Sequence, residues 1–431
     1  MTDPVLRIEG LTVDLPAGAD RAHAVEALDL SVHHGEILCI VGESGSGKSV
    51  TAQAILGLLP KRQLRVSAGA IRYAGQDLQA LPPEALRRLR GARIAMIFQE
   101  PMAALNPVLT VEEQIGEAIR AHERTGRREL RARIEALLAS VGLPDPPLLR
   151  RAHPHRLSGG QRQRVMIAMA LALSPDLLIA DEPTTALDVT TQMQILRLLK
   201  AIQAERRLGI LFITHDFGVV AEIADRVAVM RHGRVVEQGG VEQVLAAPRH
   251  PYTKALLAAV PRLESHRPPV DAAAEVVLRT AALAKTYGAT RLLFRPTRRV
   301  VAVDGVEISI RRGETLGVVG ESGSGKSTLA RLIVRLLRPD AGRIEFMGAD
   351  LSQLSRAALR PYRRHLQMVF QDPFASLNPR WTVGAIVAAG PVAQGETRAK
   401  ALARAAGLLE LVGLDPSALR RYPHEFSGGQ R

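Results

Sequence analysis

Apolar and polar positions alternate along the chain in a way that predicts an α/β protein. Short, uninterrupted apolar runs are typical of buried parallel strands, and longer stretches with helical periodicity separate them. The predicted strands are 36–41, 177–180 and 210–214. The predicted helices are 49–59, 161–173 and 191–206. This alternation predicts, within each repeat described below, a mainly parallel, helix-covered sheet that binds ligands at the carboxyl ends of its strands.

The chain contains the same ordered set of motifs twice. The run from Val41 to Ser49 recurs unchanged from Val319 to Ser327. Two further blocks, a Phe-Gln-acidic-Pro segment and a Ser-Gly-Gly-Gln-Arg segment, also occur twice, at 98–101 and 370–373 and at 158–162 and 427–431. Three matched blocks in one order indicate two duplicated domains.

A polar stretch with two adjacent prolines separates the repeats and reads as a short, fairly stiff linker. The predicted organisation is a first domain at 1–261, a linker at 262–275 and a second domain at 276–431. The first repeat continues for about another hundred residues past its serine-glycine block, whereas the second stops there. The second domain is therefore expected to be incomplete.

Composition sets limits without assigning a function. Apolar residues make up 46% and charged residues 23% of the 431 residues, as in ordinary globular proteins with room for two cores. The single cysteine, Cys39, excludes an internal disulfide and a four-cysteine zinc site, and its apolar run is typical of core packing. No stretch approaches the about 18 apolar residues of a membrane span. The amino terminus does not resemble a signal peptide, so a membrane role is expected to be peripheral.

The net charge of +14 is compatible with binding to nucleic acid or to an anionic membrane. However, the arginines are scattered and aromatic residues make up only 3% of the chain. This distribution is more typical of solvated basic faces than of a nucleic-acid footprint, and no nucleic-acid partner is expected.

The repeated run carries a phosphate-binding pattern, G-x-x-x-x-G-K-[ST], between a predicted strand and a predicted helix. In this pattern backbone N–H groups surround the phosphates, the lysine adds a positive charge, and the serine hydroxyl can ligate Mg²⁺. The predicted nucleotide-binding residues of the first repeat are Gly42, Glu43, Ser44, Gly45, Ser46, Gly47, Lys48, Ser49 and Val50. Those of the second repeat are Gly320, Glu321, Ser322, Gly323, Ser324, Gly325, Lys326, Ser327 and Thr328.

Two adjacent carboxylates follow the apolar run at 177–180. Because neighbouring side chains of a strand diverge, Asp181 and Glu182 can serve different purposes. Asp181 suits Mg²⁺, directly or through water, and Glu182 suits polarising the water that attacks the γ-phosphate. His215, after another predicted strand, fits either a surface residue or a phosphate contact. The segment 158–161 fits either a helix N-cap or an anion site.

Together these motifs resemble the ATP-binding cassette (ABC) ATPase family over nearly the whole chain. The most specific sign is Leu-Ser-Gly-Gly-Gln at 157–161, the family's signature, between Gln99 and Asp181. The resemblance implies two tandem P-loop NTPase nucleotide-binding domains of α/β fold that bind and hydrolyse ATP with Mg²⁺. It assigns Gln99 to the Q-loop, 186–188 to the D-loop and His215 to the switch histidine.

In this family two domains pack head to tail, so each ATP lies between one phosphate loop and the opposite signature. The resemblance therefore adds signature, Q-loop and adenine-stacking residues to the expected sites. The added nucleotide contacts are Ser158, Gly159, Gly160, Gln161, Tyr287, Gln371, Ser427, Gly428, Gly429 and Gln430. The expected metal ligands are Ser49, Gln99, Asp181, Ser327 and Gln371. The expected catalytic residues are Glu182, His215 and Gln99.

Two departures from the family pattern affect these sites. Alignment places Leu15 where the first repeat would carry the adenine-stacking aromatic residue, so adenine packing there is expected to be weaker or met by another side chain. The second repeat lacks the acidic strand, the D-loop and the switch histidine, so Lys326 has no catalytic glutamate beside it. Catalysis is therefore expected at the loop of Lys48, which in the family's arrangement would receive the signature at 427–430.

Finer residues resemble the oligopeptide/dipeptide importers and their fused double-cassette forms for glutathione and peptides. The Q-loop segments at 98–107 and 370–379 and the tail segment at 249–257 carry this resemblance. It implies two integral-membrane permease subunits and an extracytoplasmic substrate-binding protein as partners. It also implies a peripheral position on the cytoplasmic face of the inner (plasma) membrane, whereas no residue identifies the solute.

Three other interpretations stay open. A soluble tandem cassette acting on ribosomes would bind RNA through its basic charge, although such proteins join their cassettes by a long charged helix. A DNA-repair or chromosome cassette would need zinc modules or long coiled coils, which this sequence does not support. Finally, a second half that fails to fold would leave a non-catalytic fragment.

Overall fold

The computed structural model describes residues 3–16, 21–60, 63–99, 104–185, 187–260, 271, 273–288, 299–321, 323–371, 376–426 and 429–430. The chain divides into two compact units, Met1–Leu263 and Glu264–Arg431. The division falls inside the predicted linker at 262–275, most of which lies outside the described residues. The exact domain boundaries therefore stay a prediction.

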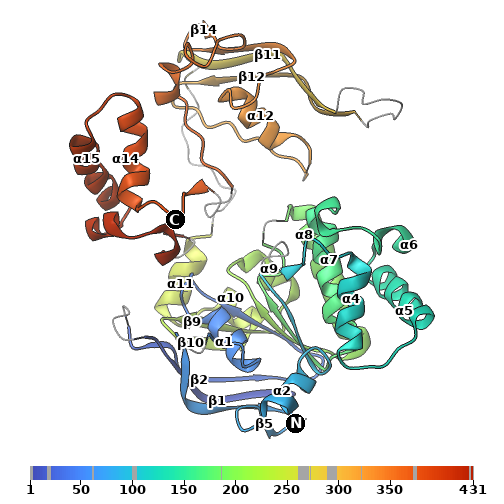
Figure 1. Ribbon diagram of the computed structural model, residues 1–431. Coiled ribbons are helices and arrows are strands. Elements are labelled where there is room, and N and C mark those ends of the chain that lie inside the picture. Colours follow the sequence, from blue (N-terminus) through green and yellow to red (C-terminus); the bar gives the residue numbers. More distant parts are fainter. Residues whose placement is uncertain are drawn as a thin grey trace. The chain divides into compact units, whose positions relative to one another are not determined.

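A six-stranded sheet forms the centre of the first unit (Figure 1). Its strand order is β10-β9-β3-β8-β7-β6, and every pair is parallel except β10 with β9. The strands are β3 (Ile37–Val41), β6 (Ile94–Ile97), β7 (Leu177–Asp181), β8 (Gly209–Ile213), β9 (Arg226–Arg231) and β10 (Arg234–Gly240). The parallel sheet predicted for this repeat is confirmed, and its three predicted strands are correct to within about one residue at each end.

Three helices of the first unit, α1, α7 and α8, correspond to those that the sequence predicts. The described helices of this unit are α1 (Lys48–Ile55), α2 (Pro83–Leu89), α4 (Val111–Arg120), α5 (Arg127–Ser140), α6 (Pro146–Leu149), α7 (Gly159–Ala170), α8 (Val189–Arg206), α9 (Phe217–Ile223), α10 (Val241–Ala246) and α11 (Pro251–Ala258). The first predicted helix, 49–59, is too long. It ends at Ile55 because Gly57 takes a left-handed φ of +60° and its N–H closes the last turn on the carbonyl of Ala54.

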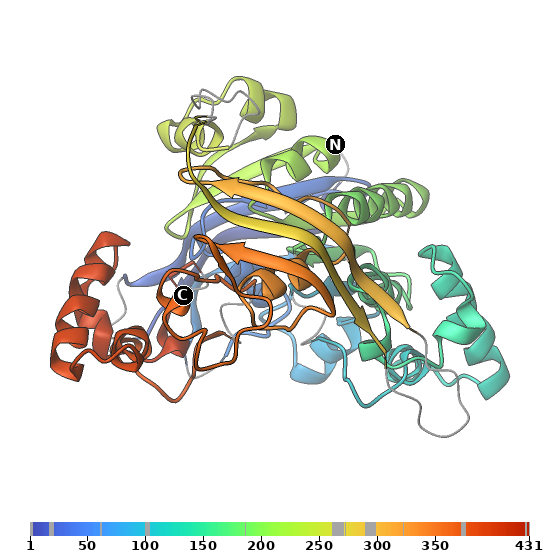
Figure 2. The ribbon, with the colours of Figure 1, turned by 90° about the horizontal axis from the view of Figure 1, so that it is seen from above.

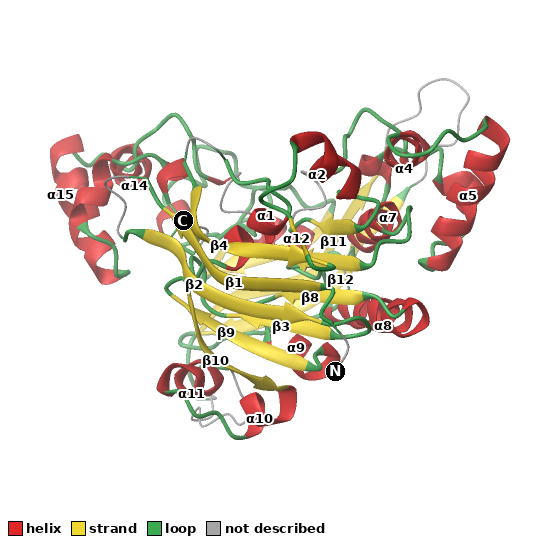
Figure 3. Cartoon of the chain, turned by 90° about the horizontal axis from the view of Figure 1, so that it is seen from below, coloured by secondary structure: helices red, strands yellow, loops and turns green. Residues whose placement is uncertain are grey.

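An antiparallel sheet that the sequence analysis did not predict packs beside the parallel one (Figure 3). Its order is β2-β1-β4-β5, and its strands are β1 (Leu6–Asp14), β2 (His23–Val32), β4 (Arg65–Tyr73) and β5 (Gln76–Asp77). The register of β1 shifts against both of its neighbours, which interrupts the simple two-residue alternation that would have revealed these strands.

Both faces of the parallel sheet are buried, which explains the continuous apolar runs of its strands. Along β3, the side chains of Ile37, Cys39 and Val41 join a core cluster with helices α4, α5, α7, α8 and α9. The side chains of Leu38 and Ile40 join a second cluster with α1 and the antiparallel sheet. Cys39 is fully buried, as predicted for a core thiol. The phosphate-binding loop after β3 therefore starts from a strand that is fixed on both faces.

The second unit repeats the antiparallel sheet, in the order β12-β11-β13-β14. Its strands are β11 (Val276–Tyr287), β12 (Val300–Arg311), β13 (Ala341–Phe346) and β14 (Ala349–Asp350), and Figure 2 shows the long pair β11 and β12. Its helices include α12 (Lys326–Ile333), α14 (Val383–Ala393) and α15 (Arg398–Leu411). The sheet and α12 share a core of buried apolar side chains, including Leu283, Leu332 and Ile344.

The prediction of a parallel sheet in each repeat is wrong for the described part of the second unit. Residues 315–319, which match β3 in the repeat, form no strand there. The side chain of Val319 is 91% exposed and that of Val318 is exposed as well. In the first unit β3 pairs with β8 and β9, which follow the signature in the chain. In the described part of the second unit, no strand pairs with residues 315–319.

Candidate functional site

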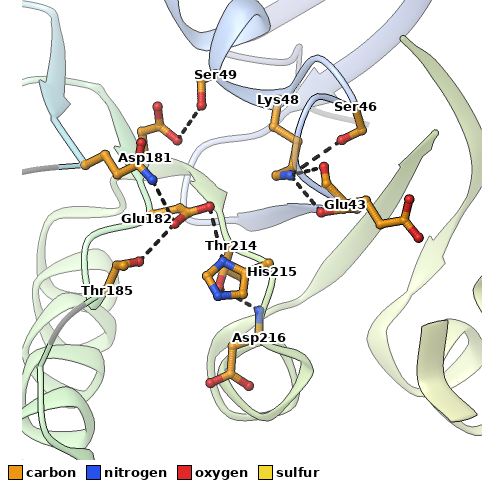
Figure 4. Close-up of polar contacts among 12 residues, drawn as sticks. Glu43, Ser46, Lys48, Ser49, Asp181, Glu182, Thr185, Thr214, His215 and Asp216 are labelled. Atoms are coloured by element: carbon orange, nitrogen blue, oxygen red, sulfur yellow. Dashed lines mark hydrogen bonds and ion pairs between the residues drawn. The ribbon is translucent and has the colours of Figure 1, made fainter. Parts of the chain in front are cut away.

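The first phosphate-binding loop connects β3 to α1 and surrounds the amine of Lys48 (Figure 4). Lys48 Nζ donates hydrogen bonds to the carbonyl oxygens of Gly42 at 2.7 Å and Glu43 at 2.8 Å, and lies 3.5 Å from Ser46 Oγ. The Lys48 side chain is buried, and this burial lowers its pKa although the charge of Glu182 opposes the shift. The loop thus holds an ammonium group at its centre, where phosphate oxygens would bind.

Two glycines allow the loop to follow this path. Gly42 has φ +149°, and a Cβ at this position would lie 2.2 Å from the carbonyl oxygen of Met230 on β9. Gly47 has φ +104°, and its Cβ would lie 2.6 Å from the carbonyl oxygen of Ala24 on β2. Any side chain at either position would push the loop away from the strands that support it. The antiparallel sheet therefore helps to shape the loop.

Asp181 and Glu182 are adjacent in the chain but face different partners. Asp181, the last residue of β7, accepts a hydrogen bond from Ser49 Oγ at 3.2 Å, and its burial raises its pKa. Glu182 lies one residue beyond the strand with a left-handed φ of +47°, which is uncommon for a residue other than glycine. Its N–H bonds to the carbonyl of Ile213 on β8. The predicted divergence of the two carboxylates thus arises from the turn after β7 as well as from the pleat.

Three side chains converge on the carboxylate of Glu182. Gln99 Nε2 donates to Oε2 at 3.1 Å and Thr185 Oγ1 donates to the same oxygen at 3.0 Å. His215 Nδ1 lies 3.2 Å from Oε1 (Figure 4). Burial alone would raise the pKa of Glu182, but the contacts with His215 and Thr185 and the charge of Lys48 outweigh burial and lower the pKa. The carboxylate is therefore ionised at neutral pH and can accept a proton from a bound water.

The contact between His215 and Glu182 predicts a pH dependence of stability. The hydrogen bond that the carboxylate of Glu182 accepts from the His215 ring raises the pKa of His215 above its ordinary value. A raised folded-state pKa contributes stability that is fully present below the unfolded-state pKa and is lost as pH rises through the folded value. Without nucleotide, we expect His215→Gln to lower the free energy of unfolding in urea more at about pH 6 than at about pH 9.

Glu182 does not obscure this test. Its folded-state pKa is lowered, so its own contribution is present above its unfolded-state pKa and is lost only as pH falls through the lower folded value. A matched variant, His122→Gln, removes a histidine from outside the site and controls for the substitution itself. An equal loss for His215→Gln at both pH values would contradict the charged contact.

The side chains of Lys48, Gln99, Glu182 and His215 line one open cleft of about 530 Å³, a size suited to a small-molecule ligand. Its lining comprises Leu15, Arg21, Ala24, Ser44, Gly45, Gly47, Lys48, Ser49, Val50, Gln99, Glu182 and His215. Leu15, the residue that alignment places at the adenine-stacking position, lines this cleft. Arg21 Nη2 donates to the carbonyl oxygen of Gly45, and the adenine contact of Leu15 stays a prediction. Sequence reasoning missed Arg21 and Thr185, because neither belongs to a motif whose spacing was informative.

The signature of the first unit does not line this cleft, as far as the described residues show. Ser158 Oγ accepts from the N–H of Gln161 at 3.2 Å, and Gln161 Oε1 accepts from the N–H of Ser158 at 3.0 Å. This capping box starts α7, with Gly159 and Gly160 in its first turn. The structure thus shows the helix N-cap that the sequence left open, and a nucleotide contact by the signature stays a prediction.

The second phosphate loop has the same local geometry in a different environment. Lys326 Nζ donates to the carbonyl oxygens of Gly320 at 2.6 Å and Glu321 at 2.7 Å, and lies 3.4 Å from Ser324 Oγ. Unlike those of Lys48, the contacts of Lys326 are exposed, and the second repeat has no counterpart of 177–182. The local sequence therefore determines the conformation of the loop, but it does not place carboxylates beside the lysine.

The other residues predicted for the second unit are exposed or lie outside the described part of the chain. Tyr287, at the end of β11, and Gln371 are exposed, as are Gly429 and Gln430. Ser322, Ser427 and Gly428 lie outside the described residues.

In the first unit, Ala186 of the predicted D-loop also lies outside the described residues. Asp188 of that D-loop caps α8, accepting a hydrogen bond from the N–H of Thr191.

No helix in the described ranges has both the length and the apolar composition needed to cross a membrane.

Comparisons with known proteins place this geometry in a family. The family model described as ABC transporter matches residues 25–185 and again 303–431, and so covers both phosphate loops. The model described as Oligopeptide/dipeptide transporter, C-terminal region, matches 236–286. Among solved structures, cbiO1 from Clostridium perfringens, described as part of the ABC transporter complex cbiONQ, has a TM-score of 0.50 and 30% identity, covering 57% of this chain and 92% of that chain.

Curated relatives agree with this placement along the whole chain. The peptidoglycan transport ATP-binding protein YejF of Agrobacterium fabrum is 48% identical and covers 100% of this chain and 79% of the relative. The glutathione import ATP-binding protein GsiA of Salmonella choleraesuis is 46% identical and covers 99% of this chain and 74% of the relative. The two matched segments confirm the predicted tandem cassettes. This chain belongs to the ABC transporter family, as an ATP-binding and ATP-hydrolysing protein.

Proposed function

We propose that this chain is the ATPase subunit of an importer that takes up peptides or a related small solute through two separate integral-membrane permease subunits. One observation carries this proposal: the first unit holds the assembled site of Lys48 and Glu182 and also most of the segment matching the oligopeptide/dipeptide transporter region, 236–286. The names of the relatives, for peptidoglycan transport and glutathione import, support a peptide-like solute. An extracytoplasmic substrate-binding protein would deliver the solute, and the chain would lie on the cytoplasmic face of the membrane.

Ser49 and Asp181 fit the Mg²⁺ ion that accompanies ATP. The Ser49 hydroxyl lies 3.2 Å from a carboxylate oxygen of Asp181, and Mg²⁺ takes oxygen ligands, mostly water and phosphate with one or two from the protein. No group of three or more His, Cys, Asp or Glu side chains is placed to hold a metal in the described ranges, so a cage made only of protein is not proposed. When bound, the ion would neutralise phosphate charge. The contact that the structure gives Gln99 is the hydrogen bond from its amide N–H to Glu182. A role for Gln99 as a metal ligand therefore stays a prediction.

Different residues of the chain would bind the phosphates, activate the attacking water and position the carboxylate. Lys48 would move its hydrogen bonds from the carbonyls of Gly42 and Glu43 to phosphate oxygens. The ionised carboxylate of Glu182 would orient the attacking water and take its proton. Gln99 and His215, both in contact with that carboxylate, would hold it in place and lie near the water.

The proposal is tested by asking what the protein binds and moves in its own cells. We expect an affinity-tagged chain, purified from detergent-solubilised membranes, to retain two integral-membrane permease subunits identified by mass spectrometry. We also expect a deletion strain to lose uptake of labelled di- and tripeptides, glutathione or peptidoglycan fragments, and the wild-type gene to restore it. The Glu182→Gln gene is expected not to restore it. Co-sedimentation with ribosomes without permeases would instead favour the ribosome factor, which the relatives found here do not support.

A further inference from the structure

We propose that Tyr252, in the tail helix α11, is a positioning residue that fixes the peptide group between Gly42 and Glu43 of the first phosphate loop. The tail segment at 249–257 drew attention in the sequence only as a resemblance to importer ATPases. The ABC transporter match of the first unit, 25–185, does not include it. The structure joins this tail to the nucleotide site.

The peptide group between Gly42 and Glu43 is held at both ends. Its carbonyl oxygen, on Gly42, accepts a hydrogen bond from Lys48 Nζ at 2.7 Å. Its N–H, on Glu43, donates to the hydroxyl oxygen of Tyr252 at 3.3 Å. Figure 4 shows the Glu43 side chain pointing away from the Lys48 amine, so Glu43 contacts that amine through its backbone carbonyl oxygen.

This peptide group is one whose orientation needs fixing. Gly42 has no Cβ and takes φ +149°, so rotation of the adjoining peptide meets little steric resistance. A rotated peptide would turn its carbonyl away from Lys48 Nζ, and the amine would lose a contact that holds it at the centre of the loop. Lys48 holds the peptide only while its amine remains on the Gly42 carbonyl, whereas Tyr252 holds the other end independently of the lysine.

Tyr252 is itself fixed from the neighbouring strand. Its side chain is 7% exposed, and the guanidinium carbon of Arg231 lies 4.7 Å from the centre of its ring, a cation–π contact. Arg231 follows Met230 on β9, whose carbonyl faces Gly42. Burial raises the pKa of Tyr252, so the hydroxyl stays neutral and keeps a lone pair for Glu43. The ring therefore cannot withdraw without losing its contact with β9.

The start of α11 is anchored as firmly as the ring. The carboxylate of Glu237, on β10, accepts hydrogen bonds from the N–H groups of Arg249 at 2.7 Å and His250 at 3.1 Å. His250 Nδ1 accepts from the N–H of Tyr252 at 3.1 Å and so caps the helix, and Pro251 occupies its first position. Figures 1 and 3 place α11 together with α10 near β10. These bonds set the direction in which Tyr252 leaves the helix.

The position of Tyr252 distinguishes it from a catalytic residue. Neither Tyr252 nor the peptide group that it supports is part of the cleft lining, whereas the next residues of the loop, Ser44 and Gly45, are. Tyr252 therefore contacts the loop and leaves the nucleotide to other residues. Once ATP is bound, its phosphate oxygens hold the Lys48 amine and the loop around it, and the support from Tyr252 matters less. The effect of losing it falls on binding.

The test is Tyr252→Phe, which removes the hydroxyl and keeps the ring over Arg231. In steady-state ATP hydrolysis by the purified chain, we expect KM and the Kd for ATP to rise about 2- to 10-fold, as for one lost hydrogen bond. The kcat is expected to stay close to the wild-type value. The amide of Glu43, followed by hydrogen exchange without nucleotide, is expected to exchange faster. Arg231→Met, which loosens the ring, is expected to shift KM in the same direction by less.

A matched control separates positioning from stability. Tyr73→Phe removes another tyrosine hydroxyl from the same unit, one that donates to Asp176 Oδ2 at 2.6 Å away from the phosphate loop. It is expected to lower stability and to leave KM unchanged. An unchanged KM in Tyr252→Phe, or faster exchange across the whole unit instead of at Glu43, would overturn the proposal. Since the assay follows only ATP, its outcome does not depend on which solute is transported.

Discussion

Glu182→Gln is expected to lower the rate of ATP hydrolysis by about 10²- to 10⁴-fold while the affinity for ATP stays close to that of the wild type. The amide has the size of the carboxylate and can still accept the hydrogen bonds of Gln99 and Thr185 at its oxygen. It cannot take a proton from water. Turnover is measured by phosphate release, and binding by equilibrium titration with a fluorescent ATP analogue.

A second glutamate controls for the change of charge. Glu84 lies on α2 and forms ion pairs with Arg87 and Arg88 of the same helix. Glu84→Gln makes the same substitution outside the cleft, and its turnover is expected to equal that of the wild type. Turnover that survives in Glu182→Gln would contradict the role proposed for this carboxylate. A parallel loss of ATP binding would instead show that Glu182 shapes the loop.

Lys48→Met is expected to lower kcat/KM for ATP by about 10³-fold, because it removes a positive charge placed for the transferring phosphate. Binding is expected to weaken by about 10- to 100-fold, as for a lost hydrogen bond to a charged group. The matched variant is Lys326→Met, in a loop of identical sequence. Its turnover is expected to stay near the wild-type value, because no counterpart of Asp181 and Glu182 follows the second loop in this chain.

Comparing these two lysine variants tests whether one loop dominates catalysis. The measurement is phosphate release by each purified full chain under the same conditions, with thermal unfolding to confirm that both variants fold. Equal losses in the two variants would contradict catalysis at the first loop alone. A larger loss at Lys326 would reverse the assignment.

The parts of the fold that the sequence predicted are those whose cause is local. The run at 36–41 reads as a buried strand because both of its faces are covered, and the glycine-rich run after it has one well-known conformation. The two copies of that run form nearly the same hydrogen bonds around Lys48 and Lys326. Their burial differs, because burial depends on strands far away in the chain.

The features that escaped prediction depend on distant contacts. The antiparallel sheet was missed because register shifts break the alternation along β1. Thr185 contacts the Glu182 carboxylate and Arg21 contacts the Gly45 carbonyl, but neither residue belongs to a sequence motif that predicts its contact. Tyr252 and Glu43 are 209 residues apart in sequence, so no local pattern announces their bond. Long-range pairing of this kind requires the folded chain.

The left-handed backbone at Glu182 has a consequence for how this protein balances stability against activity. For any residue with a Cβ, such a conformation costs about 1–2 kcal/mol, which glycine would not incur. Folded proteins as a class are stable by only about 5–15 kcal/mol, so one such residue is a measurable fraction of the margin. A chain shaped by stability alone would carry glycine after β7. Glutamate at this position marks a place where the need for a carboxylate outweighs the ease of folding.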